Sequence, residues 1–108
     1  MIVFVLAGAR LVIPAKAAAP DPAKGAEIST QCAVCHGSDG ISVDTSVPNL
    51  AGQRYPYLLA QLNAFKQGTR KNPMMNELAR PLSQEQIEDI AAYYASISIH
   101  AGQATKSK

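Results

Sequence analysis

The segment Cys32-Ala33-Val34-Cys35-His36 constrains this chain of 108 residues more than any other feature of its sequence. Two thiols separated by two residues match the spacing of the two vinyl groups of haem, to which they add as thioethers. The histidine that follows at once can place a ring nitrogen on the iron as its proximal ligand. The pentapeptide therefore predicts a chain that folds around one covalent haem c and its iron, bound through Cys32, Cys35 and His36.

Three other chemistries use a similar spacing of cysteines. A thioredoxin-like redox pair requires a βαβ framework, and β-branched runs are scarce after residue 20. A zinc site would need further ligands, whereas His100 is the only other histidine and no other cysteine follows. A disulfide across two residues would be strained and would leave His36 without a role. The sequence therefore favours the haem site over all three.

Residues 1–19 differ in composition from the rest of the chain. An apolar stretch, interrupted by Arg10, precedes an alanine-rich segment. This pattern is typical of an export signal, and the apolar part is short for a transmembrane span. We expect residues 1–19 to be a cleaved signal, residues 20–100 a periplasmic domain and residues 101–108 a polar tail. Because no positive charge precedes the apolar part, an uncleaved membrane anchor formed by residues 1–19 is the alternative.

The charge of the chain gives no indication of nucleic-acid binding. Ten Lys and Arg residues stand against eight Asp and Glu residues, but Arg10 and Lys16 lie in the expected signal. The remaining polypeptide is formally neutral, and its closest basic pair is Arg70-Lys71. Domains that bind nucleic acids instead carry a basic patch or stripe. No nucleic-acid partner is expected.

Periodic apolar residues predict three helices and no strands, so the domain should be all-α. The first helix is expected from residue 22 to about residue 32. The second is expected over residues 55–68, where Gly68 provides a stop signal. The third is expected from Ser83, whose capping-box pattern opens a helix that runs to about residue 97.

Two long loops join these helices, over residues 37–54 and 69–82. The first loop is rich in Gly, Ser, Asp and Pro, and the second contains Pro73 and Pro81. Three helices of this length bury too little apolar surface to order loops of this length by themselves. A cofactor in the centre of the domain would supply the missing core.

The iron of such a haem has three candidate second ligands downstream of His36. Met74 and Met75 lie in the second loop, and His100 lies near the end of the chain. A methionine ligand raises the reduction potential and suits electron transfer. Spacing and helical phase do not decide between the two methionines.

Several longer segments resemble class I c-type cytochromes, in particular small bacterial monohaem cytochromes c and single domains of the two-haem c-four type. The resemblance extends over residues 22–97 and is carried by G-A-E-I-S-T-Q-C-A-V-C-H-G-S-D-G, P-N-L-A-G-Q, Y-L-L-A-Q-L-N-A-F-K-Q-G-T-R, M-M-N-E-L-A-R-P-L-S and I-A-A-Y-Y-A-S. It implies the class I cytochrome c fold, with three main helices and long loops wrapped around the haem. Unlike the two-haem relatives, this chain has a single C-x-x-C-H segment.

The same resemblance implies roles for three further residues. The axial methionine of the family lies eight residues before the serine that opens the last helix, and this position is Met75. The backbone carbonyl of Pro48 should accept a hydrogen bond from His36. The guanidinium of Arg70 should meet a haem propionate. The family also carries a close crossing of the first and last helices, where Gly25 should meet Ile90 and Tyr93.

The expected function is that of a one-electron carrier between redox partners of a respiratory chain, without enzymatic activity. The partners should be redox proteins, such as a membrane oxidoreductase or oxidase, to which a monomer docks transiently. One alternative is a haem-based sensor or small haem enzyme with an open sixth iron position. Another alternative is a cytochrome subunit of a larger oxidoreductase. A stable Met75 ligand distinguishes the carrier from the sensor, because it closes the sixth position.

Overall fold

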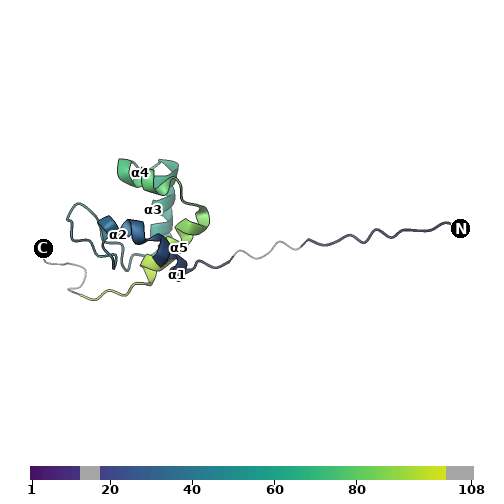
Figure 1. Ribbon diagram of the computed structural model, residues 1–108, viewed down its shortest axis with the longest axis horizontal. Helices are drawn as coiled ribbons and strands as arrows, with labels where there is room; N and C mark the ends of the chain where they lie inside the picture. Colours follow the sequence, from purple (N-terminus) through teal and green to yellow (C-terminus); the bar gives the residue numbers. More distant parts are fainter. Residues whose placement is uncertain (13–17, 102–108) are drawn as a thin grey trace.

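Five helices form the folded part of the protein in the computed structural model, which describes residues 1–12 and 18–101. They are α1 (Pro22–Ile28), α2 (Thr30–His36), α3 (Tyr55–Gln67), α4 (Pro73–Ala79) and α5 (Gln84–Ser96). Helix α1 packs against α5, and α3 packs against both α4 and α5 (Figure 1). The described residues contain no strand, so the prediction of an all-α domain is confirmed.

Local capping signals set the boundaries of α3 and α5, as predicted. Gly68 ends α3 in a left-handed conformation with φ of 77°. The side chains of Ser83 and Gln86 each accept a hydrogen bond from the backbone N–H of the other, which completes the capping box of α5. The apolar faces of these two helices meet in the core, which contains Leu58, Leu82, Ile87, Ile90, Ala91 and Tyr94.

The prediction of a single first helix ending near residue 32 is wrong. Helical structure is divided at Ser29, which separates α1 from α2, and it continues to His36. Ser29 has a ψ of −3°, whereas regular α-helix has a ψ of about −42°. Its carbonyl accepts hydrogen bonds from the backbone N–H groups of both Cys32 and Ala33, so the chain turns tightly there. Helix α2 therefore carries the whole C-x-x-C-H segment.

The prediction of a loop over residues 69–82 is wrong in part, because the segment contains α4. The Asn72 side chain caps this helix by accepting a hydrogen bond from the Met75 backbone N–H at 3.0 Å. Pro73 occupies the first turn, where a missing N–H removes no helical hydrogen bond. Pro73 is compatible with a loop in sequence, but proline is also favoured in the first turn of a helix. Met74 and Met75 consequently lie on a helix.

Residues 37–54 form a long loop, as predicted, and the loop closes on itself. The Gly40 carbonyl accepts a hydrogen bond from the Leu50 backbone N–H at 2.8 Å. The Ser42 backbone N–H donates to Asn49 Oδ1 at 2.7 Å. These bonds bring the second half of the loop back beside α2.

Gly25 is the point of closest approach between α1 and α5. A Cβ atom at this position would lie 1.9 Å from the backbone oxygen of Asp89 and 2.8 Å from Cβ of Tyr93. The predicted contact with Tyr93 is confirmed, whereas Asp89 provides the nearest atoms in place of Ile90. The Asp89 carboxylate also accepts a hydrogen bond from the Asp21 backbone N–H at 2.7 Å. Helix α5 thus holds the start of α1 as well as its middle.

We expect Gly25→Ala to destabilise the haem-loaded protein by about 1–3 kcal/mol, because the added methyl group overpacks the helix crossing. The midpoint of guanidinium denaturation should fall accordingly. Lys24→Ala, at the adjacent exposed position of α1, is the matched control and should leave the midpoint close to that of the parent. An unchanged midpoint for Gly25→Ala would show that α1 and α5 can separate at little cost.

The first twelve residues form no helix or strand and extend away from the folded domain (Figure 1). Residues 13–17 and 102–108, which include part of the predicted export signal and most of the predicted tail, lie outside the described residues. No helix in the described part of the chain is long and apolar enough to cross a membrane.

Candidate functional site

A cavity of about 540 Å³ lies among α2, α3, α4, α5 and the loop of residues 37–54. Its size lies within the range of roughly 300–1,000 Å³ that is usual for ligand and cofactor sites. Apolar side chains make up most of its walls: Leu50, Leu58, Leu62, Phe65, Leu78, Leu82 and Ile90. The predicted site residues Cys32, Cys35, His36, Pro48, Arg70 and Met75 all line this cavity. Residues predicted from a resemblance and from one contiguous motif are thus brought together in space.

Two free thiols face the cavity from α2. Cys32 is half-buried and Cys35 is exposed. Burial raises the pKa of the Cys32 thiol, and an interaction with the Tyr94 side chain offsets part of this rise. The Cys32 thiol is therefore protonated at neutral pH. Neither thiol is engaged in a disulfide, so both are free to form thioethers.

His36 is the last residue of α2 and is buried. Its Nδ1 atom lies 2.8 Å from the carbonyl oxygen of Pro48. An N–H at Nδ1 that donates to this carbonyl fixes the tautomer and leaves the Nε2 lone pair free to bind a metal. Gly37 follows with φ of 87°, and a Cβ atom there would lie 2.1 Å from the Ile41 carbonyl oxygen. This close approach requires glycine and turns the chain directly after the imidazole.

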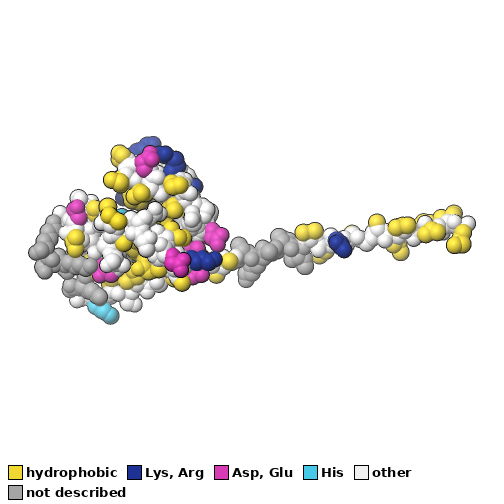
Figure 2. All heavy atoms as spheres, viewed as in Figure 1, with side chains coloured by type: hydrophobic (Ala, Val, Ile, Leu, Met, Phe, Trp, Pro, Cys, Tyr) yellow, Lys and Arg dark blue, Asp and Glu magenta, His cyan; other side chains and the backbone are white. Residues whose placement is uncertain are grey.

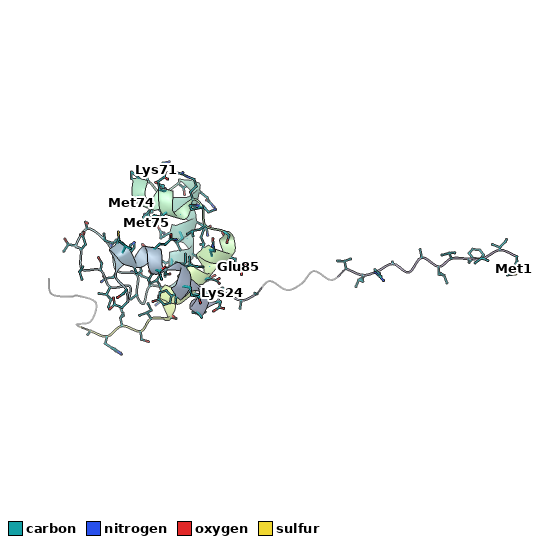
Figure 3. The ribbon with its side chains drawn as sticks, in the orientation of Figure 1. Met1, Lys24, Lys71, Met74, Met75 and Glu85 are labelled. Atoms are coloured by element: carbon teal, nitrogen blue, oxygen red, sulfur yellow. The ribbon has the colours of Figure 1, made fainter. Side chains whose placement is uncertain are left out.

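Met74 and Met75 both line the cavity from α4 (Figure 3). Met74 is 63% exposed, whereas Met75 is half-buried. Consecutive residues of an α-helix point in directions about 100° apart, so the two thioethers cannot take the same position in the cavity. The greater burial of Met75 makes it the better placed of the two for a buried ligand.

Asn76 holds α4 in place, and no sequence pattern predicted this role. Its amide donates hydrogen bonds to the carbonyl of Phe65 at 2.8 Å and to that of Arg70 at 2.9 Å. Its Oδ1 accepts a hydrogen bond from the Asn72 backbone N–H at 2.9 Å. These bonds tie α4 to the end of α3 directly beside Met75. In the sequence, Asn72 and Asn76 are simply separated by about one helical turn. The carbonyls to which Asn76 donates become its neighbours only in the folded protein.

Asn76→Ala is expected to lower the free energy of unfolding of the haem-loaded protein by about 1–3 kcal/mol, because three hydrogen bonds are lost together. Chemical denaturation followed by absorbance would measure the change. Asn63→Ala is the matched control, since the Asn63 amide donates within α3, to the Leu59 carbonyl at 3.0 Å. Equal midpoints for the two variants would contradict the anchoring role of Asn76.

Arg70 lies at the rim of the cavity. Its Nη1 donates to Gln61 Oε1 at 2.6 Å, and its guanidinium carbon is 4.6 Å from the centre of the Phe65 ring. A guanidinium carries five N–H donors, so the bond to Gln61 leaves others for a carboxylate. The structure places Arg70 among the residues that line the cavity, where it contacts Gln61 and Phe65.

The donor set and the walls of the cavity fit haem c. Two thiols and an imidazole project from one short helix in the C-x-x-C-H arrangement, and the second nitrogen of the imidazole is already hydrogen-bonded. The apolar walls suit the faces of a porphyrin, and Arg70 at the rim suits its propionates.

Similarity to known proteins identifies the family to which this chain belongs. Residues 22–98 match the family described as Cytochrome c. The chain is 42% identical over 81 residues to cytochrome c-554(548) of Halomonas halodenitrificans, a match that covers 72% of this chain and 98% of that protein. The chain belongs to the cytochrome c family. Its cofactor is accordingly a covalent haem c with its iron.

Longer cytochromes share this domain. The thiosulfate dehydrogenase electron acceptor of Stutzerimonas stutzeri is 46% identical over 70 residues, which are 62% of this chain and 32% of that protein. The solved structure of cytochrome c4 from Pseudomonas stutzeri has a TM-score of 0.70 at 39% identity, covering 74% of this chain and 47% of that one. The chain therefore spans about a third of the first protein and about half of the second. The predicted class I cytochrome c fold is confirmed.

Proposed function

We propose that this chain is a periplasmic monohaem c-type cytochrome that carries one electron at a time between redox partners of a respiratory chain. The observation that carries the proposal is the single cavity shared by Cys32, Cys35, His36 and Met75. Two candidate axial ligands from different helices line one apolar space, which is the arrangement that a closed, six-coordinate haem requires.

Each of these residues has a role in the proposed function. Cys32 and Cys35 would hold the haem as thioethers, and His36 and Met75 would be the ligands of its iron. Bound haem supplies the one-electron couple of its iron. The hydrogen bond from His36 Nδ1 to the Pro48 carbonyl orients the imidazole and makes Nε2 a stronger donor. The residues of the chain thus bind the cofactor and set its potential without breaking bonds.

Exposed apolar side chains lie among polar ones at the mouth of the cavity. Tyr57, Met74 and Leu78 line the cavity and are 50%, 63% and 37% exposed. Figure 2 shows apolar side chains over α4, and Lys and Arg side chains along the upper edge of the same part of the molecule. We propose that Arg70 pairs with a propionate at the rim and that a redox protein approaches the haem edge over Tyr57, Met74 and Leu78.

The relatives support transient docking to a redox partner. One of them is named as the electron acceptor of thiosulfate dehydrogenase. We propose that this chain likewise exchanges electrons with an oxidoreductase or oxidase at the membrane, as a monomer. Within the described residues, neither a carboxylate nor a lysine lines the cavity.

The mass of the intact exported protein tests attachment and processing together. We expect a periplasmic product that begins near residue 20 and exceeds its polypeptide mass by one haem. A product with bare thiols and no added mass would contradict the proposal. A haem-bearing product that retains residues 1–19 would support the membrane-anchored form instead.

A further inference from the structure

The Arg70 side chain is exposed, yet two side chains of α3 hold its guanidinium in place. Its Nη1 donates a hydrogen bond to Gln61 Oε1 at 2.6 Å. Its guanidinium carbon lies 4.6 Å from the centre of the Phe65 ring, and Phe65 is buried. Long exposed side chains ordinarily keep much of their rotamer freedom. These two contacts therefore order a guanidinium that solvent alone would leave mobile.

The backbone of Arg70 is fixed as well. Its N–H donates to the Ala64 carbonyl at 3.1 Å, and its carbonyl accepts a hydrogen bond from the Asn76 amide at 2.9 Å. Gln61 and Phe65 are four residues apart on α3, so the acceptor and the ring lie on the same face of that helix. The fold thus sets both the position and the direction of the guanidinium at the rim of the cavity.

The guanidinium keeps its full charge in this arrangement. Among the described residues, the ion pair nearest in sequence joins Arg80 to Glu77 at 2.6 Å, and no Asp or Glu side chain lines the cavity. Gln61 is an uncharged acceptor, so it orients Arg70 without neutralising it. A guanidinium has five N–H donors, and the bond to Gln61 uses one of them. The remaining donors can take both oxygens of a carboxylate that the chain itself does not supply.

We propose that Gln61 is a positioning residue that holds the Arg70 guanidinium as the binding site for one carboxylate of the haem. The inference rests on the proposed function, in which Arg70 pairs with a propionate, and it adds the role of Gln61. An ionised carboxylate beside the haem stabilises the oxidised, more positive state of the iron, and a guanidinium held against that carboxylate offsets the effect. Gln61 thus raises the reduction potential through Arg70.

Gln61→Leu removes the acceptor and keeps a good helix former in α3. We expect the haem-loaded variant to have a lower reduction potential than the parent, and its resonance Raman band for propionate bending to shift. A carboxylate of a docking partner has the same chemistry as a propionate, so both quantities are measured on the isolated protein. Gln67→Leu, at an exposed position of the same helix outside the cavity lining, is the matched control and should change neither quantity.

A second background tests whether Gln61 acts through Arg70. Arg70→Gln should lower the potential further than Gln61→Leu does, because the positive charge itself is lost. Adding Gln61→Leu to Arg70→Gln should then leave the potential where Arg70→Gln alone puts it, since residues that act through one contact are not additive.

The outcomes separate this inference from the proposed function. An unchanged potential or an unshifted propionate band in Gln61→Leu would overturn the role of Gln61, and so would an equal fall in potential with and without Arg70. If Gln61→Leu does not load haem, Gln61→Asn withdraws the acceptor by one methylene and is judged by the same outcomes. A parent without a reversible one-electron couple would instead contradict the proposed function.

Discussion

Met75→Ala is expected to open the sixth coordination position of the haem iron. The reduction potential should drop, because a thioether stabilises reduced iron relative to water or a harder ligand. The reduced variant should also bind carbon monoxide, whereas the reduced parent should resist it. A redox titration and the absorbance change on adding carbon monoxide would measure the two effects.

Met74→Ala is the matched control for this substitution. Met74 is 63% exposed on the same helix, so its removal should leave the potential and the response to carbon monoxide close to those of the parent. If Met74→Ala opened the site and Met75→Ala did not, Met74 would be the ligand and the carrier function would stand. If neither substitution opened the site, methionine ligation would be excluded.

Removal of the haem is expected to unfold the domain. A core of this size contributes only about 3–5 kcal/mol in a domain of roughly 70–80 residues, and here a cavity of about 540 Å³ lies among its walls. The double variant Cys32→Ser with Cys35→Ser, which cannot attach haem covalently, should therefore lack the dispersed NMR signals of fixed tertiary structure.

Variants with a single cysteine replaced are the comparison for this double variant. Cys35→Ser retains the Cys32 thiol and should give a low yield of protein that carries haem through one thioether. Intact mass distinguishes this product from the double variant. A well-dispersed NMR spectrum of the haem-free double variant would show that the helices and loops form an adequate core without the cofactor.

Elements with unambiguous local signals could be predicted from the sequence. Gly68 marks the end of α3 and the capping box at Ser83 marks the start of α5, because each of these signals is compatible with one structure in its context. Pro73 is compatible with two structures, since proline occurs both in loops and in the first turn of a helix. Helix α4 was therefore not predicted. The division at Ser29 was missed because it depends on a turn that no glycine or proline marks.

The functional site likewise contains residues that could be predicted from the sequence and residues that could not. Cys32, Cys35 and His36 could be predicted because they are contiguous and because their spacing follows from the chemistry of haem. Met74 and Met75 were expected in a loop, whereas both lie on α4. The role of Asn76 could not be predicted, since the carbonyls to which it donates become its neighbours only when α4 folds back against the end of α3. A resemblance, and no rule of spacing, indicated the carbonyl of Pro48.

The most direct test of the carrier function is a redox titration of the haem-loaded parent, followed by haem absorbance under argon and again under carbon monoxide. The account predicts one transition with a slope of about 59 mV per tenfold change, as expected for one electron. The midpoint should be the same under both gases if His36 and Met75 are both ligands of the iron. A midpoint that rises under carbon monoxide would show an open iron position in the reduced protein, and it would contradict the assignment of this chain as a closed electron carrier.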